Sequence, residues 1–149
     1  MKTIYNALLD QLQDKVKALK WIDLDFGQLE QIRSGERPPI AYPCALITIG
    51  VPRCRNLTDT IQNCQAQIII RLAFDPLGNG RTAANAPDDV RDTSLNPYDV
   101  ISDVHAALQG YETENFNSLA RSSQEKESRT DRFIYKMVYT CDFEDQTAD

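Results

Sequence analysis

The segment Cys64–Asp75, which reads C-Q-A-Q-I-I-I-R-L-A-F-D, constrains the fold of this chain more than any other. Side chains alternate between the two faces of an extended strand, so a strand here separates its residues into two sets. One set is apolar (Ala66, Ile68, Ile70, Leu72 and Phe74), and the other includes Gln65, Gln67 and Arg71. The alternation predicts a strand with one face in a core and the other face in a wetter setting.

Two further segments before this strand have strand-like patterns. Trp21–Phe26 alternates until Gly27 and predicts a short strand, and Ala45–Val51 is apolar on both faces, which predicts a position inside the sheet. The polar segment Arg53–Asn63 then serves as the long connection of an antiparallel hairpin that ends in Cys64–Asp75. Between the first two strands we expect one helical turn at Gln28–Ile32 and a loop at Ser34–Pro39, because consecutive prolines fix φ and remove backbone donors.

The C-terminal third predicts a second hairpin. Phe116–Ser123 is weakly strand-like, Gln124–Thr130 is a solvated turn, and Arg132–Phe143 is a long strand. One face of that long strand carries Phe133, Tyr135, Met137, Tyr139, Cys141 and Phe143. An aromatic row of this kind can dock a partner, but packing in a core beneath a helix is the favoured interpretation.

Two amphipathic helices are expected. Thr3–Leu19 has Thr3 as a candidate N-cap and an apolar stripe of Ile4, Leu8, Leu12, Val16 and Leu19. The second helix has Asn96 as N-cap, Pro97 at the first helical position and Gly110 as the C-terminal stop. Its buried stripe comprises Val100, Ile101, Val104 and Leu108.

The order of these elements predicts an α+β fold: a mostly antiparallel sheet of four to five strands with two helices packed on one face. Apolar residues make up 42% of the 149 and charged residues 26%, which suits a single soluble domain over 1–149. Two segments fall outside this plan. Pro76–Leu95 is a long loop without usable periodicity, and loops of this length are usually functional or disordered; the acidic tail Glu144–Asp149 is expected to be mobile.

Charge and targeting signals exclude several functions. The net charge of −6 and pI near 4.8 are opposite to the basic surface of a protein that grips phosphates, so specific nucleic-acid binding is not expected. No apolar run approaches the roughly 20 residues of a membrane-spanning helix, and the charged N-terminus does not resemble an export signal. The four cysteines are therefore expected as reduced thiols in a cytoplasmic setting.

No group of residues forms a catalytic signature, and we expect no cofactor, no metal and no enzymatic activity. Cys44, Cys54 and Cys64 lack the close pairs of zinc sites, although Cys44 and Cys64 could meet near Cys141; small buried side chains are the simpler interpretation. His105 is the sole histidine and is expected to be structural.

Two acidic groups also invite a chemical interpretation. Asp23 and Asp25 share one strand face and could act as paired carboxylates, but two charges on a solvated face are expected. Asp88, Asp89 and Asp92 could take a calcium ion, although they lack the ligand spacing of an EF-hand loop.

In its order of elements the chain resembles the small tail-terminator and tail-completion proteins of tailed bacteriophages. The features that carry the resemblance are the N-terminal helix, the Trp21–Phe26 strand, the approach Pro38-Pro39-Ile40-Ala41-Tyr42-Pro43 into Ala45–Val51, the helix Pro97–Gln109 with Gly110-Tyr111, and the closing hairpin around Gln124–Thr130. The family has no invariant catalytic motif.

The resemblance implies a structural virion protein, assembled in the host cytoplasm, that forms a ring, typically six-fold, at the end of the tail tube. Its partners would be copies of itself, the tail tube and the neck proteins, and DNA would pass through without specific binding. A ring needs two different patches on each subunit. We expect one at an exposed strand edge and the other at the long loop, with interface residues Asp75, Leu77, Asn79, Arg81, Asp88, Asp89, Arg91 and Leu95.

Two other functions stay open at this point. A head–tail neck or connector subunit belongs to the same structural class and would co-purify with the portal rather than the tail tube. A small hydrolase or ligand-binding domain is the alternative from another class. It would require His105 to lie within hydrogen-bond reach of an Asp or Cys partner in a pocket.

Overall fold

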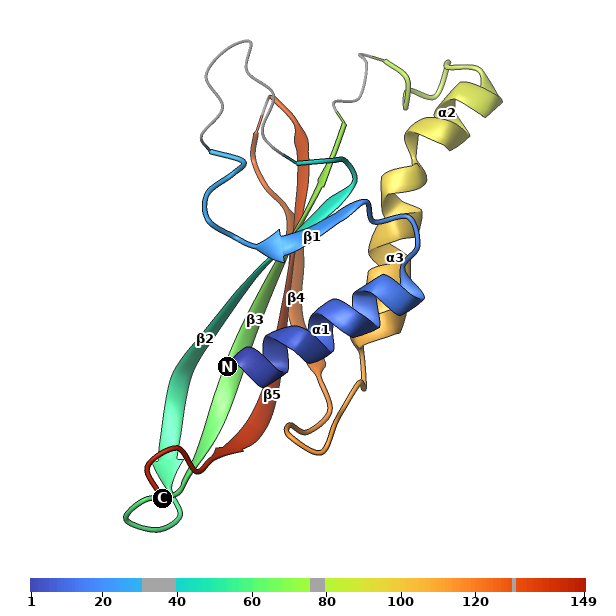
Figure 1. Ribbon diagram of the computed structural model, residues 1–149. Coiled ribbons are helices and arrows are strands. Elements are labelled where there is room, and N and C mark those ends of the chain that lie inside the picture. The colour runs from blue at the N-terminus through green and yellow to red at the C-terminus, as the bar shows by residue number, and fades with distance from the viewer. Residues whose placement is uncertain (31–39, 76–79, 130) are drawn as a thin grey trace.

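The computed structural model describes residues 1–30, 40–75, 80–129 and 131–149 (Figure 1). The predicted loop 34–39 and the last residues of the predicted turn 28–32 lie outside these ranges. Residues 28–30 do form a turn, as expected.

The described residues form one five-stranded sheet in the order β1-β2-β3-β5-β4. Its strands are β1 (Trp21–Leu24), β2 (Cys44–Asn56), β3 (Gln62–Phe74), β4 (Ala120–Lys126) and β5 (Phe133–Asp145). β1 pairs with β2 in parallel, and every other neighbouring pair is antiparallel. β3 is the central strand of the five.

Two helices cover one face of this sheet: α1 (Lys2–Lys15) and α3 (Asn96–Leu108), with the short α2 (Asp88–Ser94) leading into α3 (Figure 1). The predicted α+β class is confirmed. The core between helices and sheet contains the predicted stripes of both helices and the predicted apolar sides of β3 and β5, including Leu8, Leu12, Val104, Leu108, Ile68, Ile70, Met137 and Tyr139. The aromatic side of β5 therefore packs in a core rather than forming a docking surface.

The opposite side of the sheet, which we call the back face, is covered over part of its length. A small second core of Leu29, Cys44, Leu46, Ala73 and Ile134 forms there, with Ile40 and Tyr42 against it. Toward the β2–β3 turn the back face becomes polar. Gln67, Gln65 and Asn63 lie on the same side of β3 as Arg71, and Gln65 pairs with Arg53 on one neighbour and Asp142 on the other.

Several predicted boundaries are wrong because polar residues extend the strands. Arg53–Asn56 belongs to β2, so the predicted long link shrinks to residues 57–61, and Pro52 sits at a bulge between Gly50 and Arg53. Likewise, β4 runs to Lys126 through residues predicted as a turn, although all seven of its residues are exposed. Backbone hydrogen bonds to the neighbouring strand keep these polar segments in the sheet. A hydropathy pattern does not reveal such bonds, so the segments could not be predicted from it.

Boundaries of the other elements differ for local reasons. α1 begins at Lys2, with Met1 rather than Thr3 as N-cap, and ends before Val16, whose φ of −120° and ψ of 78° are not helical. β1 stops at Leu24, because Asp25 begins a turn in which its Oδ1 accepts the N–H of Gly27 at 2.9 Å and Gly27 has a φ of +83°.

Three further expectations change near the ends of the second helix and of the chain. Residue 96 lies inside α3, and Leu95 is its N-cap. The predicted loop 76–95 contains α2. The acidic tail, expected to be mobile, places Glu144 and Asp145 in β5, and Thr60 Oγ1 donates to Asp149 Oδ1 at 2.9 Å.

Candidate functional site

The predicted interface loop is a folded segment over its described part, residues 80–95, which we call the arm. Leu77 and Asn79 lie outside the described residues. Asp75 and Arg81 are exposed at the two sides of that gap. The structure gathers the remaining predicted residues, Asp88, Asp89, Arg91 and Leu95, on α2 and at its junction with α3.

Local hydrogen bonds organise the arm. Arg91 Nη2 lies 2.6 Å from Asp88 Oδ1, and Arg91 Nη1 donates to the carbonyl oxygen of Ala84 at 3.2 Å. The first-turn carboxylates of α2 lie at the positive end of the helix dipole, where negative charge is favourable. Asp88 and Asp89 are therefore explained by the helix itself, and no group of acidic residues with cation-binding geometry occurs within the described ranges.

The junction between arm and α3 has an open cleft of about 580 Å³. It is lined by Leu95 and Tyr98 together with Asp92, Thr93, Asn96 and Asp99. The side chains of Leu95 and Tyr98 are 37% and 48% exposed, and the Tyr98 ring contacts Phe133 and Tyr135 with centroid distances of 5.9 and 6.4 Å. An anchored aromatic ring with an exposed edge is typical of protein–protein contacts.

The sequence pattern alone did not single out Tyr98 as a surface residue. The available signal was its position in the first turn of a helix, one residue after Pro97 and off the apolar stripe.

Among the described residues, β1 and β4 are the edge strands of the sheet, and most of β2 is also open on the β1 side. β2 pairs with β1 only over residues 44–47, and beyond them its edge carries Pro52 and a bulge. β4 has one neighbour, β5, and its pairing is interrupted by a bulge between Arg121 and Ser123. Prolines and bulges discourage unspecific edge pairing. Both edges carry a bulge, but only the edge of β2 also carries a proline, so β4 is the open edge better suited to a partner strand.

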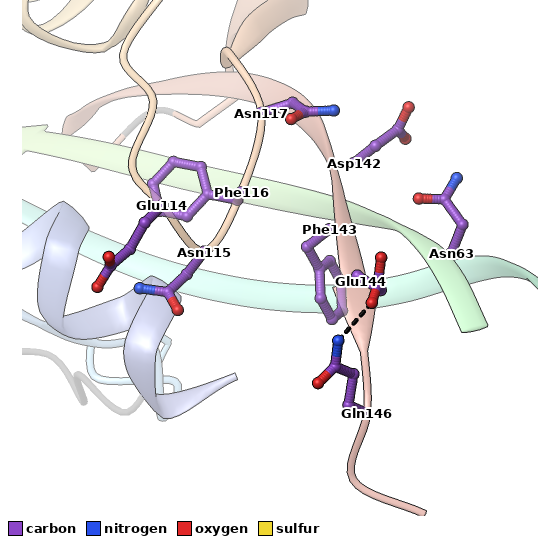
Figure 2. Close-up of a pocket in the computed structure, with 9 residues that line it drawn as sticks. All are labelled: Asn63, Glu114, Asn115, Phe116, Asn117, Asp142, Phe143, Glu144 and Gln146. Carbon is purple, nitrogen blue, oxygen red and sulfur yellow. Dashed lines mark hydrogen bonds between the residues drawn. The ribbon is translucent and has the colours of Figure 1, made fainter. Parts of the chain in front are cut away.

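A second cleft, of about 530 Å³, lies beside the C-terminal half of β5 (Figure 2). Its wall combines the carboxylates of Glu114, Asp142 and Glu144 with side-chain amides from Asn63, Asn115, Asn117 and Gln146, and no cation is among its lining residues. Figure 2 shows these polar groups spread along an open surface, with Gln146 donating to Glu144. Such a surface repels phosphates.

On the back face, the described residues include an ion-pair network around the largely buried Arg71, and the similarly buried Arg132 donates to the Tyr42 hydroxyl at 2.6 Å. Arg71 donates through Nε to Glu127 Oε1 at 2.7 Å, its Nη2 lies 2.5 Å from Glu30, and its Nη1 lies 3.1 Å from Asp25. The Arg71 and Asp25 side chains are 13% and 11% exposed. The hydrogen bond that Arg71 donates to Glu127 raises the pKa of Arg71, so the guanidinium stays charged.

The expectation that Asp23 and Asp25 form two charges on a solvated face is wrong for Asp25. Asp23 Oδ1 instead accepts the N–H of Leu24 at 2.8 Å. Arg71 binds Asp25, which follows β1, and Glu127, which follows β4. The network therefore attaches both segments to the back face, and its function is structural.

His105 makes a contact that does not resemble a catalytic pair. Its Nδ1 lies 3.1 Å from the hydroxyl of Tyr139, and the rings stack at 6.2 Å. Burial raises the pKa of Tyr139 to about 12, which keeps the phenol protonated, and burial together with Arg121 lowers the pKa of His105. The neutral ring therefore packs against the core, and none of the clefts described here includes it.

The cysteines also differ from the expected arrangement. Cys44 lies opposite Ala73 and does not meet Cys64; Cys64 instead lies opposite Cys54, which is exposed. The interpretation of all four as small buried side chains holds for Cys44, Cys64 and Cys141 alone.

Within the described ranges, no helix is long and apolar enough to cross a lipid bilayer. Comparison of the sequence with protein families and with curated proteins finds no match.

Proposed function

We propose that this chain is a structural virion protein that assembles head-to-tail with copies of itself into a ring at the end of a bacteriophage tail tube. The observation that carries the proposal is the presence of two unlike surfaces on one subunit. The arm junction with Leu95 and Tyr98 lies at one end of the long strands, and the second surface is the open edge of β4 (Figure 1). A head-to-tail contact closed by rotation requires such a pair.

The charge of the molecule supports a channel function. The polar part of the back face carries the amides of Gln67, Gln65 and Asn63. Arg53 and Arg55 on β2 face Asp142 and Glu144 on β5 across Gln65 and Asn63, so the two cations and two carboxylates leave little net charge. The whole chain carries −6. A wall that is neutral to acidic lets DNA slide past, because each Lys or Arg contact to phosphate would add affinity.

The residues at the arm junction support protein–protein contact rather than ligand binding. Leu95 and Tyr98 expose apolar surface to solvent. Association would bury this surface and would be favoured by a free energy of about 25 cal/mol per Å² buried. The cleft beside them is open, whereas sites for small molecules enclose most of the ligand surface.

Electron microscopy of the purified protein tests the proposal directly. Wild-type protein is expected to show rings with a central hole, and Leu95→Glu is expected to reduce the ring fraction at least tenfold, because association would bury a charge. Leu57→Glu is the matched control, since Leu57 is 50% exposed at the β2–β3 turn and away from the arm. Absence of rings in wild-type protein, or equal losses in the two variants, would contradict the proposal.

A further inference from the structure

Two cysteines at the end of the β2–β3 hairpin form a thiol pair that ring assembly does not use. Cys54 lies directly opposite Cys64 in the antiparallel register, and their Sγ atoms are 2.6 Å apart. Directly opposed residues have Cα atoms about 4.5–5.5 Å apart. A disulfide spans Cα distances of about 4.4–6.8 Å, so the backbone already has a compatible separation.

The two thiols of the pair differ in solvent exposure. Cys54 is exposed and can meet a dissolved oxidant, whereas Cys64 is buried behind it. The register places the other two thiols less favourably. Cys44 is opposite Ala73 at the far end of the hairpin, and Cys141 is opposite Ala66, which makes it a diagonal neighbour of Cys64. Diagonal neighbours have Cα atoms about 7–8 Å apart, beyond the usual disulfide range.

We propose that Cys54 and Cys64 are a modification site that a small-molecule disulfide, such as glutathione disulfide, converts into an intramolecular disulfide. The inference does not rest on the proposed ring function, because it depends only on the geometry of the hairpin.

The reaction proceeds in two exchange steps. The Cys54 thiolate attacks one sulfur of glutathione disulfide and releases one glutathione thiolate. The Cys64 thiolate then attacks the Cys54 sulfur of the mixed disulfide and releases the second glutathione. Two protein thiols are oxidised, one glutathione disulfide is reduced to two thiols, and the protons lost from Cys54 and Cys64 end on glutathione.

The second step is expected to be the slower one. Burial and the hydrogen bond with Cys54 raise the pKa of Cys64 to about 11, so little of it is thiolate at neutral pH. The mixed disulfide on Cys54 is therefore expected to accumulate before it resolves. The product closes the hairpin around residues 57–61, next to the contact of Thr60 with Asp149.

The test is intact mass spectrometry of the full chain after incubation with glutathione disulfide, followed by peptide mapping without reduction. The expected product has lost two hydrogens and links the peptides that carry Cys54 and Cys64. The variant with Cys44→Ala and Cys141→Ala retains only the pair and is expected to give the same product. Cys54→Ser, at an exposed position, is expected to lose no hydrogens.

Three results would overturn the proposal. The first is a stable glutathione adduct on Cys54 that never resolves, and the second is a disulfide that links Cys64 to Cys141. The third is a disulfide between two chains instead of within one. Circular dichroism of Cys54→Ser, matched to wild type, establishes that a negative result does not reflect loss of the fold.

Discussion

At the scale of single residues, Arg71 shows how a charge is used inside this fold. Replacement by Met keeps much of the aliphatic stem but leaves Asp25 and Glu127 without their partner. We expect Arg71→Met to lower the free energy of unfolding by about 3 kcal/mol, because removing one member of a buried ion pair strands the other charge. Glu30 is half exposed, so water screens its ion pair with Arg71, and this pair contributes little to the free energy of unfolding. Urea unfolding measures the change.

Arg91→Met provides the control for that measurement. Arg91 pairs with Asp88, whose side chain is 89% exposed, and a pair of this kind contributes less than about 1 kcal/mol. Equal losses for the two variants would contradict the assignment of a buried network at Arg71.

His105 gives a prediction about pH. Its pKa in the folded protein lies below the ordinary value of 6.5, because burial and Arg121 disfavour the charged ring. The unfolded chain therefore binds the proton first as pH falls through 6.5, and stability should decrease in that range. His105→Gln is expected to remove this decrease, which urea unfolding between pH 7.5 and 5 would detect as about equal stability across the range. A slope unchanged by the substitution would contradict it.

The sequence predicts the buried residues far better than the partners of the charged ones. Apolar and polar residues alternate along β3, and this alternation alone is enough to assign each of its residues to the core or to the back face. The contacts of Arg71 were not predictable, because Asp25 and Glu127 lie 46 and 56 residues away along the chain. The exposed edge of Tyr98 depends on where Phe133 and Tyr135 fall, which is also set by tertiary packing.

At the scale of elements, β3 separates two environments along one strand. Ile70 is fully buried between helices and sheet, whereas its neighbour Ile69 points to the back face and is only partly buried. We expect Ile70→Ala to lower the free energy of unfolding by about 3 kcal/mol through lost burial and a residual cavity, and Ile69→Ala to lower it by about 1 kcal/mol. Urea unfolding of the two variants makes the comparison, and a reversed order would contradict the face assignment.

Element types were more predictable than element lengths. Strands and helices with apolar stripes were found, because burial leaves a periodic signal. The polar ends of β2 and β3, the second half of β4 and the seven-residue α2 were missed, since backbone pairing and local capping fold them without an apolar stripe. The same reasoning explains why the arm was predicted as an irregular loop.

At the scale of the whole molecule, the α+β class follows from the order of elements, whereas the strand order depends on long-range pairing. The central claim is that copies of this chain associate head-to-tail through unlike surfaces. Two surfaces of different composition, at the arm junction and at the sheet edges, support this claim.

Size-exclusion chromatography with light scattering over a concentration series tests the claim most directly. The account predicts one closed oligomer of several subunits, whose mass stops increasing once the ring is complete, and loss of that oligomer in Leu95→Glu but not in Leu57→Glu. A protein that keeps the 16.9 kDa mass of a single chain at every concentration would contradict the account.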